Sequence, residues 1–111
     1  MPQIKLYEEV GESTEELILK HLGLVKRVAL HLKVRVPAFM ELNELIQAGM
    51  IGLLEAAKSY DSNRGVEFEN YAHTRVKGAM IDEVRRMSAL PRSAVAIIKT
   101  HNEAAKQLEG K

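Results

Sequence analysis

Histidine is the residue of this sequence best suited to bind a metal or to transfer a proton near neutral pH. No HExxH or comparable ligand spacing joins the four histidines, which stand at His21, His31, His73 and His101. The sequence holds no cysteine, so neither a thiolate metal site nor a disulfide is available. These patterns predict no metal centre and assign the histidines to packing or to the surface.

Paired carboxylates and phosphate-binding loops are other arrangements that would indicate an enzyme. Asp82 and Glu83 are adjacent, and adjacent residues of a helix point to different parts of its surface rather than toward one substrate. The glycine-rich phosphate loops and the GxSxG nucleophile turn are absent from the sequence. We therefore expect a protein that binds rather than catalyses, with no cofactor.

Charge is distributed unevenly along the chain, although the whole sequence carries a net charge of only +1. Residues 1–63 hold 7 Lys/Arg and 9 Asp/Glu, whereas residues 64–99 hold 7 Lys/Arg and 4 Asp/Glu. A basic surplus on one element is typical of a surface that binds phosphates. A solvated helix face explains the same surplus, and the sequence leaves both interpretations open.

Length and composition indicate one compact domain. The chain has 111 residues, of which 46% are hydrophobic and 28% charged, as is ordinary for a globular protein. No apolar run reaches the roughly 20 residues that a membrane span needs, and the acidic start, with Glu8, Glu9 and Glu12, lacks the basic flank of a signal peptide. We expect a cytoplasmic protein with no membrane partner.

Helical periodicity begins near the amino terminus. Ser13 and Glu16 have the spacing of a capping box, which predicts a helix start. From Ile18 to Leu32 apolar residues recur every three or four positions, and this stripe ends before Pro37. The pattern predicts one helix over this stretch.

A second helix is expected over residues 42–60, where a wide apolar face predicts the centre of the core. Gly49 and Gly52 lie inside it, and glycine in a helix interior indicates close packing against a neighbour. Residues 61–65 form a turn cluster in which Gly65 suits a positive φ. The chain is expected to reverse its direction there.

The remaining sequence continues the helical pattern. A long amphipathic helix is predicted over residues 67–87, and Pro91 suits the first turn of a last helix. No run of β-branched and aromatic residues alternates with polar ones, so no strand is expected. The predicted fold is all-α, a compact bundle of about four helices.

One constellation of residues is dense enough to indicate a family. It comprises residues 43–61 (NELIQAGMIGLLEAAKSYD), Arg64-Gly65, Phe68, Tyr71-Ala72 and residues 75–85 (RVKGAMIDEVR). Over residues 17–108 the sequence resembles region 2 of the sigma-70 family of bacterial transcription initiation factors. Residues 77–85 and Pro91-Arg92-Ser93 are similar to the flagellar or motility branch of that family.

The resemblance implies a division of the chain. Residues 1–90 would be sigma region 2, with 1–12 as a loose N-terminal tail, and 91–111 would begin the helix of region 3. The family continues into further DNA-binding domains that this sequence lacks, so we expect a fragment of a longer factor.

A polymerase-binding surface is the first functional implication of the resemblance. It places one face of the helix over residues 42–60 on the coiled-coil clamp of the largest subunit of core RNA polymerase. That face comprises Glu44, Gln47, Met50, Ile51, Leu54 and Glu55. A plain core helix explains the leucines equally well, so Gln47 carries the information specific to the family.

The resemblance also implies a pocket that captures a flipped adenine of the minus-ten promoter element. Its residues are Tyr60, Arg64, Phe68 and Tyr71. Aromatic side chains stack on unpaired bases for about 1 to 3 kcal/mol each, and nearby cations hold the phosphates. Taken alone, Phe68 and Tyr71 are better interpreted as core residues, and the two roles are compatible.

A third surface follows along the helix over residues 67–87, where the resemblance implies contacts with promoter DNA at the upstream edge of the minus-ten element. The implied residues are Thr74, Arg75, Lys77, Gly78, Asp82, Arg85 and Arg86, with Arg92 next toward the extended upstream bases. Housekeeping factors carry two duplex-opening tryptophans where this chain has Thr74 and Arg75. Ser88 and Ala89 replace an Asp-Trp pair that is frequent in the motility branch.

The resulting hypothesis is a non-enzymatic specificity factor for transcription initiation at motility genes. Its implied partners are core RNA polymerase, promoter DNA, mainly the non-template strand of the minus-ten element, and an anti-sigma factor. The alternative is a small helical interaction module whose basic face serves only solubility.

Overall fold

The computed structural model describes residues 13–109, and all the secondary structure within that range is helical. Its elements are α2 (Thr14–Lys20), α3 (Leu22–Lys33), α4 (Leu42–Ser59), the short 3-10 helix η1 (Ser62–Arg64), α5 (Phe68–Ser88) and α6 (Arg92–Glu109). The predicted all-α class is confirmed. None of the helices described is both long and apolar enough to cross a membrane.

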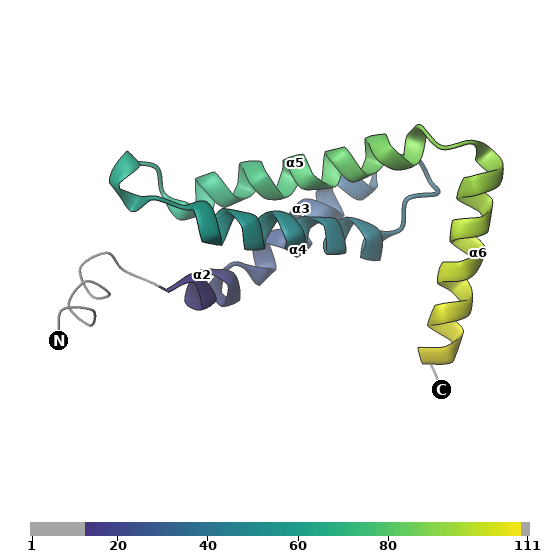
Figure 1. Ribbon diagram of the computed structural model, residues 1–111, viewed down its shortest axis with the longest axis horizontal. Helices are drawn as coiled ribbons and strands as arrows, with labels where there is room; N and C mark the ends of the chain where they lie inside the picture. The colour runs from purple at the N-terminus through teal and green to yellow at the C-terminus, as the bar shows by residue number, and fades with distance from the viewer. Residues whose placement is uncertain (1–12, 110–111) are drawn as a thin grey trace.

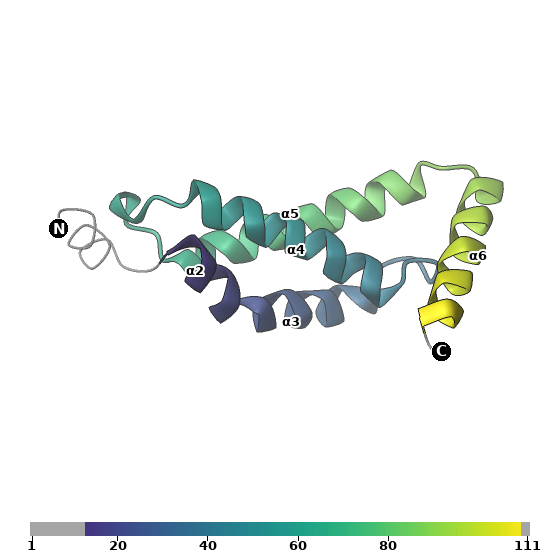
Figure 2. The ribbon, with the colours of Figure 1, turned by 60° about the horizontal axis from the view of Figure 1, so that its bottom comes forward.

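The centre of the fold is an antiparallel hairpin of α4 and α5, with α3 packed across one side of it (Figures 1 and 2). The hairpin turns at η1, where the Asp61 carboxylate accepts a hydrogen bond from the backbone N–H of Asn63 at 2.9 Å. Gly65 follows with φ of 78°, in the left-handed region that glycine adopts without strain. The positive φ predicted for this residue is confirmed.

Glycine sets the distance between the two helices of the hairpin. A Cβ at Gly49 would lie 2.3 Å from Met80 Cε, and one at Gly52 would lie 2.8 Å from the backbone carbonyl of Arg75. A flexible methionine end can move aside, whereas the Arg75 carbonyl belongs to the α5 backbone. The close packing predicted for both glycines is therefore confirmed, and the neighbour least able to move aside is the Arg75 backbone at Gly52.

The first predicted helix is divided at His21, which is a correction to the sequence-based expectation. The backbone N–H of His21 donates to Ile18, at 3.1 Å, rather than to Leu17 four residues back. The His21 side chain satisfies the Leu17 carbonyl instead, because its Nδ1 donates to that oxygen at 2.8 Å. The helix start predicted at Ser13 is confirmed, since the Ser13 hydroxyl caps α2 by accepting from the Glu16 N–H at 3.2 Å.

The core is built from α3, α4, α5 and one loop residue. Its fully buried side chains include Val25, Leu45, Leu53, Val76 and Met80. Met40 joins them with no exposed surface, although it lies in the loop before α4. Helical periodicity could not identify this residue because a loop has no repeating face.

Helix α6 runs across the end of the bundle (Figure 1). Lys106 pairs with Glu41, and Asn102 Nδ2 donates to Glu44 Oε1 at 2.8 Å. Ile98 packs partly against the core, while Ile97 on the other side is 71% exposed. Polar contacts with the start of α4 thus hold α6 in place, although α6 buries little apolar surface.

Candidate nucleic-acid and protein interfaces

Three aromatic side chains gather where α4 ends and α5 begins. The Tyr60 ring stands edge-on to Phe68, with centroids 5.1 Å apart, and tilts against Tyr71 at 5.7 Å. The Tyr60 hydroxyl donates to the carbonyl of Val66 at 2.6 Å, which fixes the ring to the turn. Three of the four predicted pocket residues are therefore in contact.

The depth of these rings differs. Phe68 is 7% exposed and is closed on another side by the His21 ring at 4.8 Å, so it belongs to the core. Tyr60 and Tyr71 are half-buried and present the accessible part of the cluster. Arg64, the fourth predicted residue, extends from η1 with its side chain 83% exposed and 4.0 Å from Asp61.

A groove of about 540 Å³ lies between α4 and α5 beside this cluster. Five of the predicted DNA-contacting residues line it, namely Thr74, Arg75, Gly78, Asp82 and Arg86. Ile51 and Glu55 of α4 form the opposite wall. The predicted polymerase surface and the predicted DNA surface thus share one groove rather than occupying separate faces.

Lys77 lies elsewhere, in a second groove of about 470 Å³ between α3 and α5. Arg27 and Glu69 face each other across that groove at 3.5 Å, and His73 also lines it. The absence of metal-ligand spacing assigned His73 to packing or to the surface, and no sequence pattern predicted a second groove. Only the arrangement of α3 against α5 brings these side chains together.

Arg85 and Arg86, the basic residues in the second half of α5, form ion pairs within the helix. Arg85 lies 3.9 Å from Asp82, and Arg86 Nε donates to Glu83 Oε1 at 2.8 Å. Both are i, i+3 pairs on one helix in which the arginine is exposed, 77% for Arg85 and 62% for Arg86, and such surface pairs stabilise a fold little and exchange partners easily. Both arginines therefore remain available to a phosphate.

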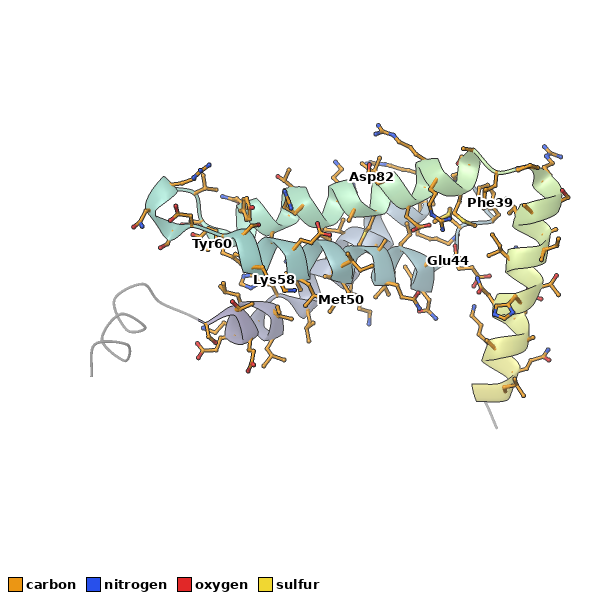
Figure 3. The ribbon with its side chains drawn as sticks, in the orientation of Figure 1. Phe39, Glu44, Met50, Lys58, Tyr60 and Asp82 are labelled. Atoms are coloured by element: carbon orange, nitrogen blue, oxygen red, sulfur yellow. The ribbon has the colours of Figure 1, made fainter. Side chains whose placement is uncertain are left out.

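The predicted polymerase face of α4 is only partly open. Ile51 is 57% exposed and Leu54 39% exposed, and Gln47 is also exposed, whereas Met50 packs partly against the core. Glu44 lies at the end of α4 nearest α6, and Tyr60 lies at the other end of that helix (Figure 3). Its Oε2 is buried and has no hydrogen-bond partner within the described part of the chain.

The family comparison matches most of this architecture. Sigma-70 region 2 matches residues 17–89, which include α3, α4 and α5 in full. This stretch also contains the aromatic cluster and the residues that line both grooves, whereas α6 lies outside it.

Similar proteins carry names from the same family. The RNA polymerase sigma factor FliA of Pseudomonas aeruginosa is 44% identical over 110 residues, covering 97% of this chain and 44% of that protein. FliA of Escherichia coli is 44% identical over 90 residues, covering 81% and 38%. The RNA polymerase sigma-D factor of Bacillus subtilis is 30% identical over 95 residues, covering 86% and 37%.

The chain spans less than half the length of these curated relatives. Within that span the resemblance inferred from the sequence motifs is confirmed, and so is the branch to which they pointed. The chain belongs to the sigma-70 family, in the branch of the FliA factors.

Proposed function

We propose that this chain is the part of a motility-type sigma factor that binds core RNA polymerase and captures the melted minus-ten element. The observation that carries the proposal is the accessible aromatic pair of Tyr60 and Tyr71, beside which Arg75, a residue that lines the α4–α5 groove, lies 6.0 Å from the Tyr71 ring. Aromatic faces for bases beside cations for phosphates are what single-stranded DNA requires.

Polymerase binding is proposed for the exposed α4 surface that contains Gln47, Ile51 and Leu54. The exposed fractions of the two aliphatic side chains support this role, since large apolar side chains on a surface often mark a partner site. The coiled-coil clamp of the largest polymerase subunit is the proposed partner. Glu44 would join the interface only after α6 has moved away from it.

Promoter contacts are proposed for both sides of α5 and for the start of α6. Tyr60, Tyr71 and Arg64 would hold the flipped adenine, with Phe68 supporting them from the core. The other proposed contacts are Thr74, Arg75, Lys77, Gly78, Asp82, Arg85, Arg86 and Arg92. No chemical step is assigned to any of these residues, and an anti-sigma factor is proposed as a further partner.

Fluorescence anisotropy tests the proposal. Labelled 12-nucleotide single strands are first selected from a random pool by the 111-residue chain with core polymerase, and the best sequence is compared with its scrambled version. We expect tighter binding of the selected strand, weakening as salt rises because phosphate contacts release counterions. Equal affinity for both strands, together with no polymerase binding, would favour the helical interaction module instead.

A further inference from the structure

One ion pair joins the two surfaces that the proposed function assigns to different partners. Arg75 Nη2 of α5 lies 3.5 Å from Glu55 Oε2 of α4. The two residues are predicted to contact DNA and polymerase, respectively, yet here they contact each other. Neither side chain is buried, since 45% of Arg75 and 60% of Glu55 is exposed.

The position of this pair follows from the hairpin. Gly52 allows the α5 backbone at Arg75 to approach α4 so closely that a Cβ would lie 2.8 Å from the Arg75 carbonyl. Glu55 stands three residues after Gly52, on the same face one turn further along α4. The closest approach of the two helices therefore places this carboxylate beside the guanidinium.

The pair is also joined to the aromatic cluster. The Arg75 Cζ lies 6.0 Å from the centroid of the Tyr71 ring, within the range of a cation–π contact. The Ser59 hydroxyl donates to the carbonyl of Glu55 at 2.8 Å. Because that hydroxyl has a single proton, the Tyr71 hydroxyl must be the donor in its own 2.8 Å contact with Ser59. One turn of α4 thus contacts both Tyr71 and Arg75 and favours one orientation of the two side chains.

We propose that Glu55 is a positioning and specificity-determining residue for DNA, acting through Arg75, rather than a polymerase contact. This inference rests on the proposed function. The carboxylate holds the planar guanidinium over Tyr71 before DNA arrives, so that little of the side chain's freedom is lost on binding. The Glu55 carboxylate also repels DNA phosphates. A strand that stacks no base on Tyr71 therefore competes poorly with Glu55 for Arg75.

The decisive measurement is the ratio of affinities for the selected and scrambled strands, in the presence of core polymerase. Glu55→Gln keeps the shape of the side chain and removes its charge. We expect tighter binding of scrambled DNA, weaker binding of the selected strand, and a ratio lower by roughly twofold to fivefold. A purely structural role would weaken both strands equally and leave the ratio unchanged.

Three further variants isolate the pathway through Arg75. Arg75→Lys retains the charge but loses the planar fork, and it should lower the ratio by itself. In the double variant, Glu55→Gln should lower the affinity ratio little further, because Arg75, the residue through which Glu55 acts, is already altered. Glu15→Gln, an exposed residue in the first turn of α2, removes the same charge far from the groove and should leave the ratio at the wild-type value.

The outcomes separate this inference from the function on which it rests. If Glu55→Gln weakens polymerase binding by the same factor in both Arg75 backgrounds and leaves the strand ratio intact, Glu55 is a polymerase contact and the inference is wrong. The proposed function would stand in that case. If the wild-type chain with polymerase does not distinguish the two strands, both are wrong.

Discussion

Gln47 is the residue on which the proposed polymerase interface depends most directly. It is exposed on α4, near the aliphatic side chains of Ile51 and Leu54. Because its side chain is exposed, a substitution there is expected to test binding without disturbing the core. A charge introduced at this point would have to lose its water when the partner docks, which is costly without a matching group.

We predict that Gln47→Lys weakens the pull-down of core polymerase about tenfold or more while the helical circular dichroism spectrum stays unchanged. Gln107→Lys is the matched control, since it makes the same change on an exposed position of α6. Loss of helicity in Gln47→Lys would mean that the side chain supports the fold. Equal retention of polymerase by both variants would remove Gln47 from the interface.

Sequence patterns predicted individual residues well where backbone geometry or a known cap dictated the residue type. Gly65 and Ser13 are examples, because a positive φ and a helix start each favour a narrow set of residues. His21 was missed because its side chain replaces a backbone hydrogen bond, and hydrophobic spacing does not record such an exchange. The contact between Glu55 and Arg75 was missed for a related reason, since it depends on the register between two helices.

At the scale of elements, the α4–α5 hairpin contrasts two kinds of glycine. Gly52 faces the backbone of Arg75 so closely that a Cβ would meet its carbonyl at 2.8 Å. A Cβ added at Gly78, inside α5, would meet no neighbouring atom within 4 Å, so internal packing does not require glycine there. Sequence spacing could not tell these two glycines apart, because both lie inside amphipathic helices.

We predict opposite stability effects for the two alanine variants. Gly52→Ala should lower the free energy of unfolding by about 1 to 3 kcal/mol because the helices must separate. Gly78→Ala should raise it by about 0.5 to 1 kcal/mol because alanine favours the helix. Urea unfolding followed by circular dichroism measures both. A destabilised Gly78→Ala would show that this part of α5 is more crowded than the structure indicates.

Gly78 also carries a functional expectation that follows from the same comparison. A glycine that costs stability and is not needed for packing suits a surface on which another molecule approaches the backbone closely. Gly78→Ala should therefore weaken binding of the selected single strand in the presence of polymerase, even though the variant is more stable. Unchanged affinity would leave Gly78 without a role in the α4–α5 groove.

At the scale of the whole molecule, the docking of α6 decides how much of α4 is open. The Glu41–Lys106 pair and the hydrogen bond from Asn102 to Glu44 both cross from α6 to the start of α4. The Lys106 hydrogen bond is the largest influence on Glu41 and holds the pKa of its carboxyl below the ordinary 4.5, with Lys99 and Lys33 adding weaker electrostatic attraction. The same contact raises the pKa of Lys106 above 10.5.

These shifts give the docking of α6 a defined dependence on pH. A carboxyl whose pKa is lower in the docked state contributes stability in full above 4.5 and loses it as the pH falls through the lowered value. The raised pKa of Lys106 keeps its contribution intact until the pH exceeds 10.5. Docking of α6 is thus expected to be constant near neutral pH and to weaken in acid, below 4.5.

Spin labels can follow this change because the sequence has no native cysteine. With labels at His31→Cys on α3 and Gln107→Cys on α6, we predict one narrow distance distribution at neutral pH that broadens as the pH falls below 4.5. Lys106→Met should broaden it already at neutral pH and reduce the dependence on acid, since Glu41 then keeps only the weaker attraction of Lys99 and Lys33. A narrow distribution in Lys106→Met would mean that Ile98 and Asn102 alone keep α6 over Glu44.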